Sequence, residues 1–381
     1  MEVWQKLIDQ AGLLNLTWQN GVMFLVAGTL IFLAIKKNFE PLLLIPIGFG
    51  ALLANIPLAD LSASSSFKGD HAPLLQLIYN VGIKTELLPP VIFMGVGALT
   101  DFRPLLGRPI TFLLGAAAQL GIFVAALGAY YLFGFTAKEA ASIGIIGGAD
   151  GPTTIFLTAK LAPHLLGAVA VAAYSYMALV PVIQPPIIRL LTTREEREID
   201  MPQAKPVSHT AVIVFPIITC MLASLLIPSC APLLGMLMFG NLLRESRVTD
   251  RLSNTVGGPL INIVTIFLGL TVGATMEGTG FLQPRTLFIL VLGMFAFASS
   301  TFGGLIFAKF INLFMAHDKR INPCIGAAGV SAVPMAARVV QSFVSKETDG
   351  RVNPLMAAMG PNVAGVIGSA VAAGVFLALL Q

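Results

Sequence analysis

The chain is dominated by apolar stretches that are each long enough to cross a lipid bilayer. A helix needs about 20 apolar residues to span the hydrocarbon core. Only 11% of the 381 residues are charged and 56% are hydrophobic, whereas about a quarter of the residues in soluble domains are charged. This pattern predicts an all-α, polytopic membrane protein. The predicted spans are residues 18–35, 41–58, 82–99, 109–133, 165–191, 207–227, 231–243, 256–276, 287–310 and 354–380, and a polar loop is expected at 59–80.

Two further apolar segments, residues 137–161 and 321–344, are interrupted by glycine and proline. In the first, Asp150 is followed by Gly151 and Pro152. Proline lacks an N–H group and restricts the residue before it, so a helix should break here. At membrane depth, the freed backbone groups are tolerated only where protein or a polar cavity satisfies them.

The basic loops indicate how these segments cross the membrane. If Lys36 and Lys37 are cytoplasmic, a full crossing by residues 137–161 would place the basic loop after residue 191 outside, against the positive-inside rule. A re-entrant hairpin that enters from outside keeps that loop in the cytoplasm. By the same reasoning, residues 321–344 are predicted to form a re-entrant hairpin that enters from the cytoplasm.

One hairpin in each half of the chain, entered from opposite faces, is typical of inverted-repeat transporters. The small residues around the two breaks are also weakly similar. We therefore predict two pseudo-repeated halves, with a cation site where the hairpin tips meet. The predicted parts are an amphipathic N-terminal helix (1–17), a first membrane half (18–191) with hairpin 137–161, a charged cytoplasmic linker (192–206) and a second membrane half (207–381) with hairpin 321–344.

Asp150 is the leading candidate for a functional side chain. Carboxylates within membrane segments are rare and mark functional sites by default. Beside carbonyl groups freed by a helix break, a carboxylate can bind a hard cation such as Na⁺. The alternative is a structural kink in which backbone N–H groups cap the carboxylate.

The second interrupted segment offers three further candidates. Asn322 and Ser331 carry neutral oxygens, which suit a cation site that already holds one carboxylate. Asn322 could instead cap a helix that begins at Pro323, and Ser331 could be a small packing residue. Arg338 could pair with an anionic substrate, or it could be an arginine that reaches to the membrane interface.

Further polar residues in the predicted spans complete the set. Tyr174 and Tyr176 lie close together on one span, and a buried phenol there could donate a hydrogen bond or relay a proton, or it could be an interfacial packing residue. Asn362, after Gly360 and Pro361, could add an oxygen ligand or simply begin a helix.

Other chemistries find no support in the sequence. Cys220, Cys230 and Cys324 form no metal-ligand pattern and are interpreted as small buried apolar residues. No phosphate-binding loop is present, so we do not expect ATP to be the energy source. The net charge of +4 reflects basic loops rather than a nucleic-acid-binding surface.

Five runs are longer and more specific than this composition requires. They are IIGGADGPT (145–153), AAYSYMALVP (172–181), QPP (184–186), AGVSAVP (328–334) and MGPNVAG (359–365). Together they closely resemble the β subunit of sodium-pumping, biotin-dependent decarboxylases, a family that serves oxaloacetate, methylmalonyl-CoA and glutaconyl-CoA decarboxylases. The likeness covers essentially the whole chain. The oxaloacetate members often have a longer loop after the second span than residues 59–80 here.

This resemblance implies a membrane-bound reaction in the bacterial cytoplasmic membrane. A soluble subunit moves a carboxyl group from the substrate to biotin, and the β subunit then decarboxylates the carboxybiotin. The reaction consumes a proton, releases CO₂ and drives Na⁺ out of the cell. The chain itself would carry no covalent biotin. The implied partners are a biotinylated carboxyltransferase α subunit or a separate biotin carrier, a small single-span γ or δ subunit, further copies of this chain and membrane lipids, but no nucleic acid.

The resemblance also assigns roles to residues. The functional positions of the family fall on Asp150, Tyr176, Asn322, Gly326, Ser331 and Arg338, and Asn362 lies in the matching GPN run. We expect Na⁺ ligands at Asp150, Asn322, Gly326, Ser331 and Asn362, and catalytic roles for Tyr176, Ser331 and Arg338, with Arg338 meeting carboxybiotin.

Two other functional classes compete with this interpretation. One is a stand-alone secondary transporter for Na⁺ and a carboxylate, which would use the same scaffold without chemistry. The other, a structural membrane anchor for a soluble enzyme, fits poorly with an aspartate at membrane depth.

Overall fold

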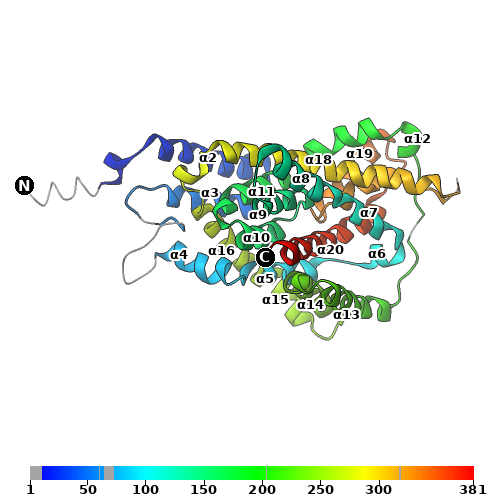
Figure 1. The fold of residues 1–381 in the computed structure, drawn as a ribbon. Helices are drawn as coiled ribbons and strands as arrows, with labels where there is room; N and C mark the ends of the chain where they lie inside the picture. The colour runs from blue at the N-terminus through cyan, green and yellow to red at the C-terminus, as the bar shows by residue number, and fades with distance from the viewer. Residues whose placement is uncertain (1–10, 60, 64–72, 203, 317–318) are drawn as a thin grey trace, which may run out of the picture.

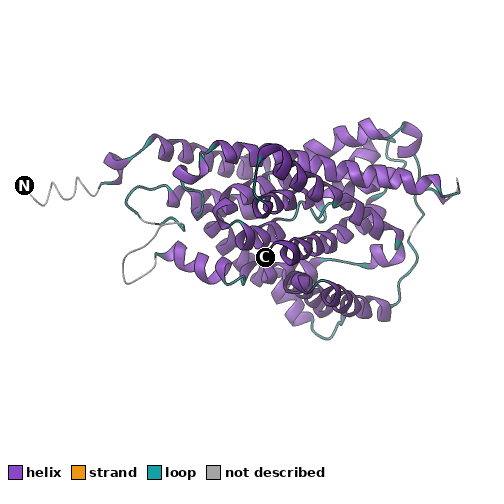
Figure 2. Cartoon of the chain, in the orientation of Figure 1, coloured by secondary structure: helices purple, strands orange, loops and turns teal. Residues whose placement is uncertain are grey.

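The computed structural model describes residues 11–59, 61–63, 73–202, 204–316 and 319–381. Throughout these residues the regular structure is helical and contains no strand (Figure 2). The predicted all-α class is therefore confirmed. The amphipathic helix expected for residues 1–17 lies mostly outside the described residues, which begin with a short turn, η1 (Gly12–Asn15).

Seven helical segments of the described chain are long and apolar enough to cross a membrane, or eight if one bent pair is counted as a span. The prediction of a polytopic membrane protein is therefore confirmed. The seven segments are α2 (Trp18–Lys37), α7 (Ile110–Ala118) with α8 (Leu120–Phe133), η4 (Pro163–Leu165) with α11 (Leu166–Leu191), α13 (His209–Leu226), α15 (Asp250–Thr255) with η6 (Val256–Leu260) and α16 (Ile261–Ala274), α18 (Pro284–Leu313), and α20 (Leu355–Leu380).

The bent pair comprises residues 74–84 and 88–99. It shows that the polar loop predicted at 59–80 ends too late, because a helix begins inside it. Helix α4 (Leu74–Tyr79) already lies within it, followed by a π-helical turn, η2 (Asn80–Lys84), and then α5 (Leu88–Leu99). The two parts are bent by 65°. Pro73 stands just before α4, where its fixed φ favours helix initiation, and the polar residues upstream had masked this start in the sequence.

Two shorter helices cross membrane-spanning helices at very close range. Helix α3 (Pro41–Ala54) packs on α16, and α14 (Ala231–Glu245) packs on α5. A methyl group on Gly50 of α3 would overlap the carbonyl of Leu270, and one on Gly240 of α14 would overlap the carbonyl of Met94. Glycine at these two positions is what allows the backbones to touch.

Both interrupted segments are broken helices that fold back on themselves. The first consists of α9 (Ala137–Gly144), η3 (Ile145–Gly148) and α10 (Gly151–Leu161). The helix break predicted at Asp150 is present, and Gly151 and Pro152 form the first turn of α10. Near the two ends of this segment, Glu139 Oε1 and His164 Nε2 lie 2.9 Å apart.

The second interrupted segment consists of η8 (Pro323–Gly329), an irregular stretch and α19 (Met335–Glu347). Both of its ends attach to the charged helix α12 (Arg194–Arg197). Asn322 Nδ2 donates to the carbonyl of Arg197 at 3.0 Å, and Glu347 Oε2 accepts from Arg197 Nη1 at 2.8 Å. Each broken segment therefore ends close to where it begins, and both are packed among α11, α18 and α20 (Figure 1).

Candidate functional site: the meeting point of two broken helices

The tips of the two broken segments are in direct contact. The backbone N–H of Ser331, in the irregular stretch of the second segment, donates to the carbonyl of Gly148 at 2.8 Å. Gly148 ends η3, and Asp150 follows two residues later. The fold therefore brings together two candidate residues, Asp150 and Ser331, that lie in different halves of the sequence.

Asp150 is both capped and buried without a neutralising charge. Its side chain is 6% exposed, and its Oδ1 accepts from the Thr153 N–H at 3.2 Å, so the carboxylate is the N-cap of α10. Its Oδ2 accepts from Ser369 Oγ at 2.5 Å. These partners are a backbone N–H and a hydroxyl, and neither cancels a negative charge. Because burial of an isolated charge is costly, this site favours a cation or a proton at the carboxylate.

Asn362 holds the tip of the second segment. Its Nδ2 donates to the carbonyls of Val330 and Ala332 at 2.7 and 3.3 Å, on either side of Ser331. Only the NH₂ group can donate to two carbonyls, so the amide orientation is fixed and Oδ1 points elsewhere. Neither Asn362 Oδ1 nor Ser331 Oγ has a hydrogen-bond partner, although both are buried. Buried acceptors without partners are rare, and they require a donor or a cation.

The two neighbouring tyrosines of α11 have different surroundings. The ring of Tyr174 lies against the first turn of α10, where a methyl group on Gly151 would collide with it. Its hydroxyl is buried without a partner. Tyr176 points from another side of the helix, and its hydroxyl donates to the carbonyl of Leu290 in α18. The structure thus places Tyr174, rather than the expected Tyr176, next to the Asp150 turn.

Asn322 and Gly326 lie along η8 rather than at the tip. Asn322 Oδ1 accepts from the Cys324 N–H at 3.0 Å, and its Nδ2 donates to two carbonyls, so it is the N-cap of η8. At about 2 Å of rise per residue, η8 separates Asn322 from the tip by roughly 14 Å. Gly326 lies in close backbone contact with Gly304 of α18.

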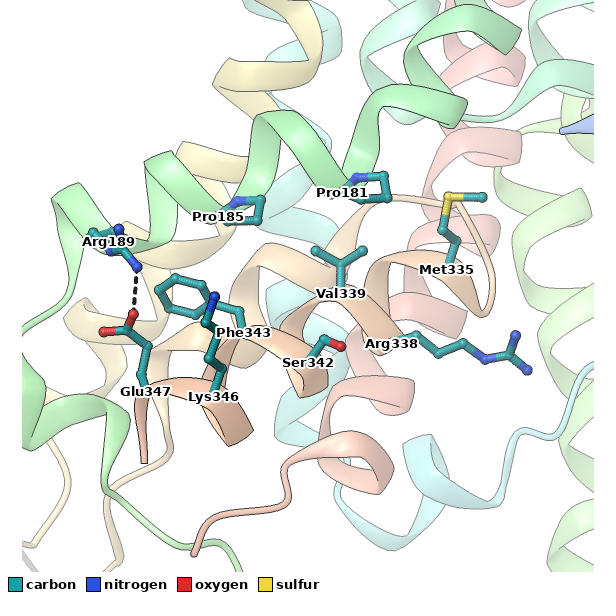
Figure 3. Close-up of a pocket in the computed structure, with 10 residues that line it drawn as sticks. All are labelled: Pro181, Pro185, Arg189, Met335, Arg338, Val339, Ser342, Phe343, Lys346 and Glu347. Carbon is teal, nitrogen blue, oxygen red and sulfur yellow. Dashed lines mark hydrogen bonds and ion pairs between the residues drawn. The ribbon is translucent and has the colours of Figure 1, made fainter. Parts of the chain in front are cut away.

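Arg338 lines a separate cavity of about 540 Å³ between α11 and α19 (Figure 3). Arg189 and Glu347 form an ion pair of 2.6 Å at one end, and the Arg338 guanidinium points away from it (Figure 3). With Lys346, the cavity walls carry three basic side chains and one acid, so the cavity has the charge to receive an anion. The remaining walls are mostly apolar: Pro181, Pro185, Met335, Val339, Ser342 and Phe343.

Sequence reasoning missed two residues of the site, Ser369 and Gln119, whose Nε2 donates to the carbonyl of Gly329 at 3.3 Å, and it favoured Tyr176 over the neighbouring Tyr174. Ser369 follows Asn362 by seven residues on α20, and this spacing places both side chains on one helix face. That periodicity was the signal that could have found Ser369. Gln119 is an isolated polar residue in an apolar span, which is a recognisable marker of function in membranes.

The donor atoms of the site are oxygens. In the described residues there is no group of three or more His, Cys, Asp or Glu side chains that could hold a metal ion. One carboxylate with hydroxyl, amide and carbonyl oxygens suits a hard cation rather than a transition metal. The three cysteines are free; Cys230 and Cys324 are buried and Cys220 is partly buried.

Comparison with known proteins gives the family. A family model described as the Na⁺-transporting oxaloacetate decarboxylase beta subunit matches residues 19–380. Methylmalonyl-CoA decarboxylase subunit beta of Veillonella parvula is 56% identical over 377 residues, which cover 99% of this chain and 97% of the relative. Glutaconyl-CoA decarboxylase subunit beta of Acidaminococcus fermentans is 55% identical over 375 residues, covering 98% and 97%. Oxaloacetate decarboxylase beta chain of Klebsiella pneumoniae is 53% identical over 430 residues, covering 99% of each chain.

The alignment to the Klebsiella chain is longer than the 381 residues of this chain, so that relative has additional residues. The family model covers residues 19–380, which include both broken segments. Together with the membrane-spanning helices, these matches make this chain a multi-pass protein of the bacterial cytoplasmic membrane. The chain belongs to the family of beta subunits of Na⁺-transporting decarboxylases.

Proposed function

We propose that this chain decarboxylates carboxybiotin presented by a partner subunit and couples the reaction to Na⁺ export, with consumption of a proton. The observation that carries this proposal is the buried carboxylate of Asp150, which lies without a basic partner where two broken helices meet. The names of the relatives supply the reaction, because all three are decarboxylase subunits.

The cation would be held by oxygens of the two tips. Asp150 supplies the one negative charge that matches a monovalent cation, while Ser331 Oγ and Asn362 Oδ1 are buried acceptors that lack a donor. A cation favours the ionised carboxylate, and protonation releases the cation. Asn322 and Gly326 are better suited to positioning the second tip, since the first caps η8 and the second packs it on α18.

The anion would be received in the cavity between α11 and α19. Arg338 can bind a carboxylate with two parallel N–H donors, and it lies only seven residues beyond Ser331 in the sequence. Decarboxylation breaks the bond between the ureido nitrogen and the carboxyl carbon, and the electron pair left on nitrogen takes up a proton. Tyr176 and Ser331 are the hydroxyls that we propose to serve this proton transfer.

The proposed membrane topology rests on the paired arrangement of the helices. Helix α3, in the first half of the chain, packs on α16 in the second half. Helix α14, in the second half, packs on α5 in the first half. Both α5 and α16 follow π-helical turns, η2 and η6. We propose two inverted halves, 18–191 and 207–381, whose hairpins 137–161 and 321–344 enter from outside and from the cytoplasm, respectively.

The test compares Asp150→Asn with Asp250→Asn, a matched change at an exposed residue. Decarboxylation of free carboxybiotin by the purified complex should lose its Na⁺ stimulation in the first variant and keep it in the second. Near-normal, Na⁺-dependent activity of Asp150→Asn would overturn the proposal. Arg338→Ala should raise the carboxybiotin concentration needed for activity while sparing Na⁺ binding.

A second function, Na⁺-coupled transport of a carboxylate without chemistry, is favoured by the same basic cavity. Purified chain in liposomes would then take up a carboxylate with Na⁺ and would not release CO₂ from carboxybiotin. The decarboxylase requires a biotinylated carboxyltransferase α subunit or biotin carrier, a small γ or δ subunit and assembly with further copies of the chain. Identification of the carboxyltransferase that co-purifies names the acid or thioester that feeds the complex.

A further inference from the structure

Gln119 is a buried amide at a break between two helices. It lies at the junction of α7 and α8, and its side chain is 5% exposed. The flanking spans are apolar, so a carboxamide here is costly unless its polar atoms find partners.

Its amide nitrogen is bound to the second tip. Nε2 donates to the carbonyl of Gly115 at 3.1 Å, within α7, and to the carbonyl of Gly329 at 3.3 Å, where η8 ends. Because only the NH₂ group can donate to two carbonyls, the orientation of the amide is determined by its own contacts. Oε1 must therefore point in the other direction.

The amide oxygen faces the first tip. Oε1 lies 3.4 Å from the position that a Cβ atom on Gly148 would occupy, and Ser369 Cβ lies 3.2 Å from the same position. On the other side, a Cβ on Gly368 would lie 2.8 Å from Gln119 Cγ. Two glycines thus leave room for this side chain, which contacts both broken segments.

Oε1 has no hydrogen-bond partner and is fully buried. Ser331 Oγ and Asn362 Oδ1, from the second tip and from α20, are in the same state. Near the Asp150 turn, the described residues therefore include two amide oxygens, Gln119 Oε1 and Asn362 Oδ1, that can only accept and that have no donor. A cation satisfies several acceptors at once, whereas each of them left bare costs free energy.

We propose that Gln119 Oε1 is a further ligand of the exported cation, and that Gln119 makes cation affinity depend on the contact between the two tips. This inference rests on the proposed Na⁺ export. The amide adds an oxygen and no charge, so the site keeps the single negative charge that suits a monovalent ion. Through Nε2 the same side chain holds Gly329, so a displaced second tip withdraws the ligand.

The test measures Na⁺ binding without turnover. The purified complex is unfolded thermally in increasing NaCl, with choline chloride keeping the ionic strength constant, because a ligand that binds the folded state raises its stability. Gln119→Leu should raise the Na⁺ concentration for half of the full stabilisation about tenfold, as loss of a contact to a charged group predicts.

Asn241→Leu is the matched control. Asn241 is a buried amide of α14 that donates to the carbonyls of Gly97 and Thr100 at 3.3 and 2.8 Å, and its oxygen also lacks a partner. It lies at the α5–α14 crossing, so its loss should lower the midpoint temperature without changing the Na⁺ dependence. Equal shifts of the Na⁺ dependence in both variants would make Gln119 a packing residue.

Gln119→Glu separates the oxygen from the nitrogen. This variant keeps an acceptor and loses the bond to Gly329, so a ligand role predicts that its Na⁺ response persists and becomes pH-dependent. A purely structural role predicts the same loss as in Gln119→Leu, and this result would overturn the inference. Gln119→Glu also decides the question if the leucine variant does not fold.

Asp150→Asn tells the two proposals apart. If Na⁺ stabilises wild type and Asp150→Asn equally, the proposed cation site itself fails. If Asp150→Asn abolishes the stabilisation and Gln119→Leu leaves it unchanged, Na⁺ binding at the tips stands and the role assigned to Gln119 is wrong.

Discussion

Asp150 has the capping role that the sequence offered as one alternative, and it is also the proposed ion ligand. It caps α10 through Thr153, and its other oxygen is bound by a hydroxyl of α20, so the helix start and the candidate ion site share one side chain. A carboxylate that both caps a helix and binds an ion makes the geometry of the helix terminus depend on whether the ion is bound. Substitution of Asp150 is therefore expected to affect both local folding and ion binding, and for this reason a neighbouring hydroxyl gives a cleaner test.

Ser331→Ala removes a buried hydroxyl and leaves the backbone bond to Gly148 in place. We expect a higher Na⁺ requirement for decarboxylation, by about three- to tenfold, because one neutral ligand is lost.

Tyr176→Phe should instead alter the pH dependence of decarboxylation, since the Tyr176 hydroxyl is proposed to transfer a proton. Assembly of the complex should be normal in both. Ser253→Ala, outside the site, is the control; unchanged Na⁺ and pH profiles in the two test variants would make both residues packing residues.

Sequence reasoning identified Asp150, Ser331 and Asn362 because each stands at a helix breaker in an apolar region. It did not identify Gln119 or Ser369, and it favoured Tyr176 over Tyr174, because the relevance of these residues depends on which helices pack together. The spacing along one helix relates Ser369 to Asn362, but it cannot show that α20 passes the Asp150 turn. Contacts between distant elements, such as Ser331 with Gly148, are set by tertiary packing and leave no local pattern.

The two broken helices are the elements that organise the site. Residues 137–161 were expected to form a hairpin because of charge asymmetry, and the contact between Glu139 and His164 brings the two ends together. The resulting element is held at its base by the contact between Glu139 and His164 and at its tip by backbone and amide contacts. Its orientation in the membrane is a prediction that can be measured directly.

Single cysteines at Lys138 and His164 should react with a membrane-impermeant maleimide from the same, outer side in right-side-out vesicles. Cys220, which is partly buried, is first replaced by alanine to remove background labelling. A cysteine at Arg194 should react only after the membrane is made permeable. Labelling of positions 138 and 164 from opposite sides would show that the segment crosses the membrane.

The base of the second broken helix should be sensitive to acid. Glu347 is hydrogen-bonded by Arg189, which holds the pKa of the carboxyl below its ordinary value of 4.5, although partial burial opposes this shift and Arg197 adds to it. Since the pKa is lower in the folded state, this pairing stabilises the fold above about pH 4.5 and the contribution is lost as the pH falls through the lower, folded-state value.

Glu347→Gln should therefore lower the midpoint of thermal unfolding at neutral pH and reduce the dependence of that midpoint on pH below 4.5. The comparison is a series of unfolding curves for wild type and variant from neutral to acidic pH. Glu195→Gln, in the exposed part of α12, is a control for loss of one acidic side chain. Parallel pH profiles for wild type and Glu347→Gln would contradict this account.

At the scale of the whole molecule, the all-α class and the membrane spans followed from hydrophobic length alone. The boundaries were least accurate at α4 and α15, where the helices continue through π-helical turns into polar sequence. The close crossings of α3 with α16 and α14 with α5 were not predicted, because the many glycines of the chain do not reveal which pairs face each other. Biotin chemistry likewise came from resemblance and not from any pattern of the residues.

The whole molecule is expected to work only within a complex. Purification of the tagged chain from its native membrane should bring down a protein that reacts with streptavidin, because the proposed reaction uses carboxybiotin carried by a partner subunit. Removal of that partner should abolish oxaloacetate or CoA-thioester decarboxylation and leave decarboxylation of free carboxybiotin intact. A solitary chain that moves a carboxylate with Na⁺ in liposomes would favour the transporter.

The bond between the two tips consists only of backbone atoms, the N–H of Ser331 and the carbonyl of Gly148. Substituting a side chain at either position leaves both groups available, with proline at position 331 as the exception because it lacks the N–H. Other side-chain oxygens can therefore replace those of the proposed ion site, and so change which ion it prefers, without loss of this backbone hydrogen bond. Ion preference and the contact between the two tips can therefore change independently in evolution. A set of variants with different ion preferences should all keep this backbone hydrogen bond.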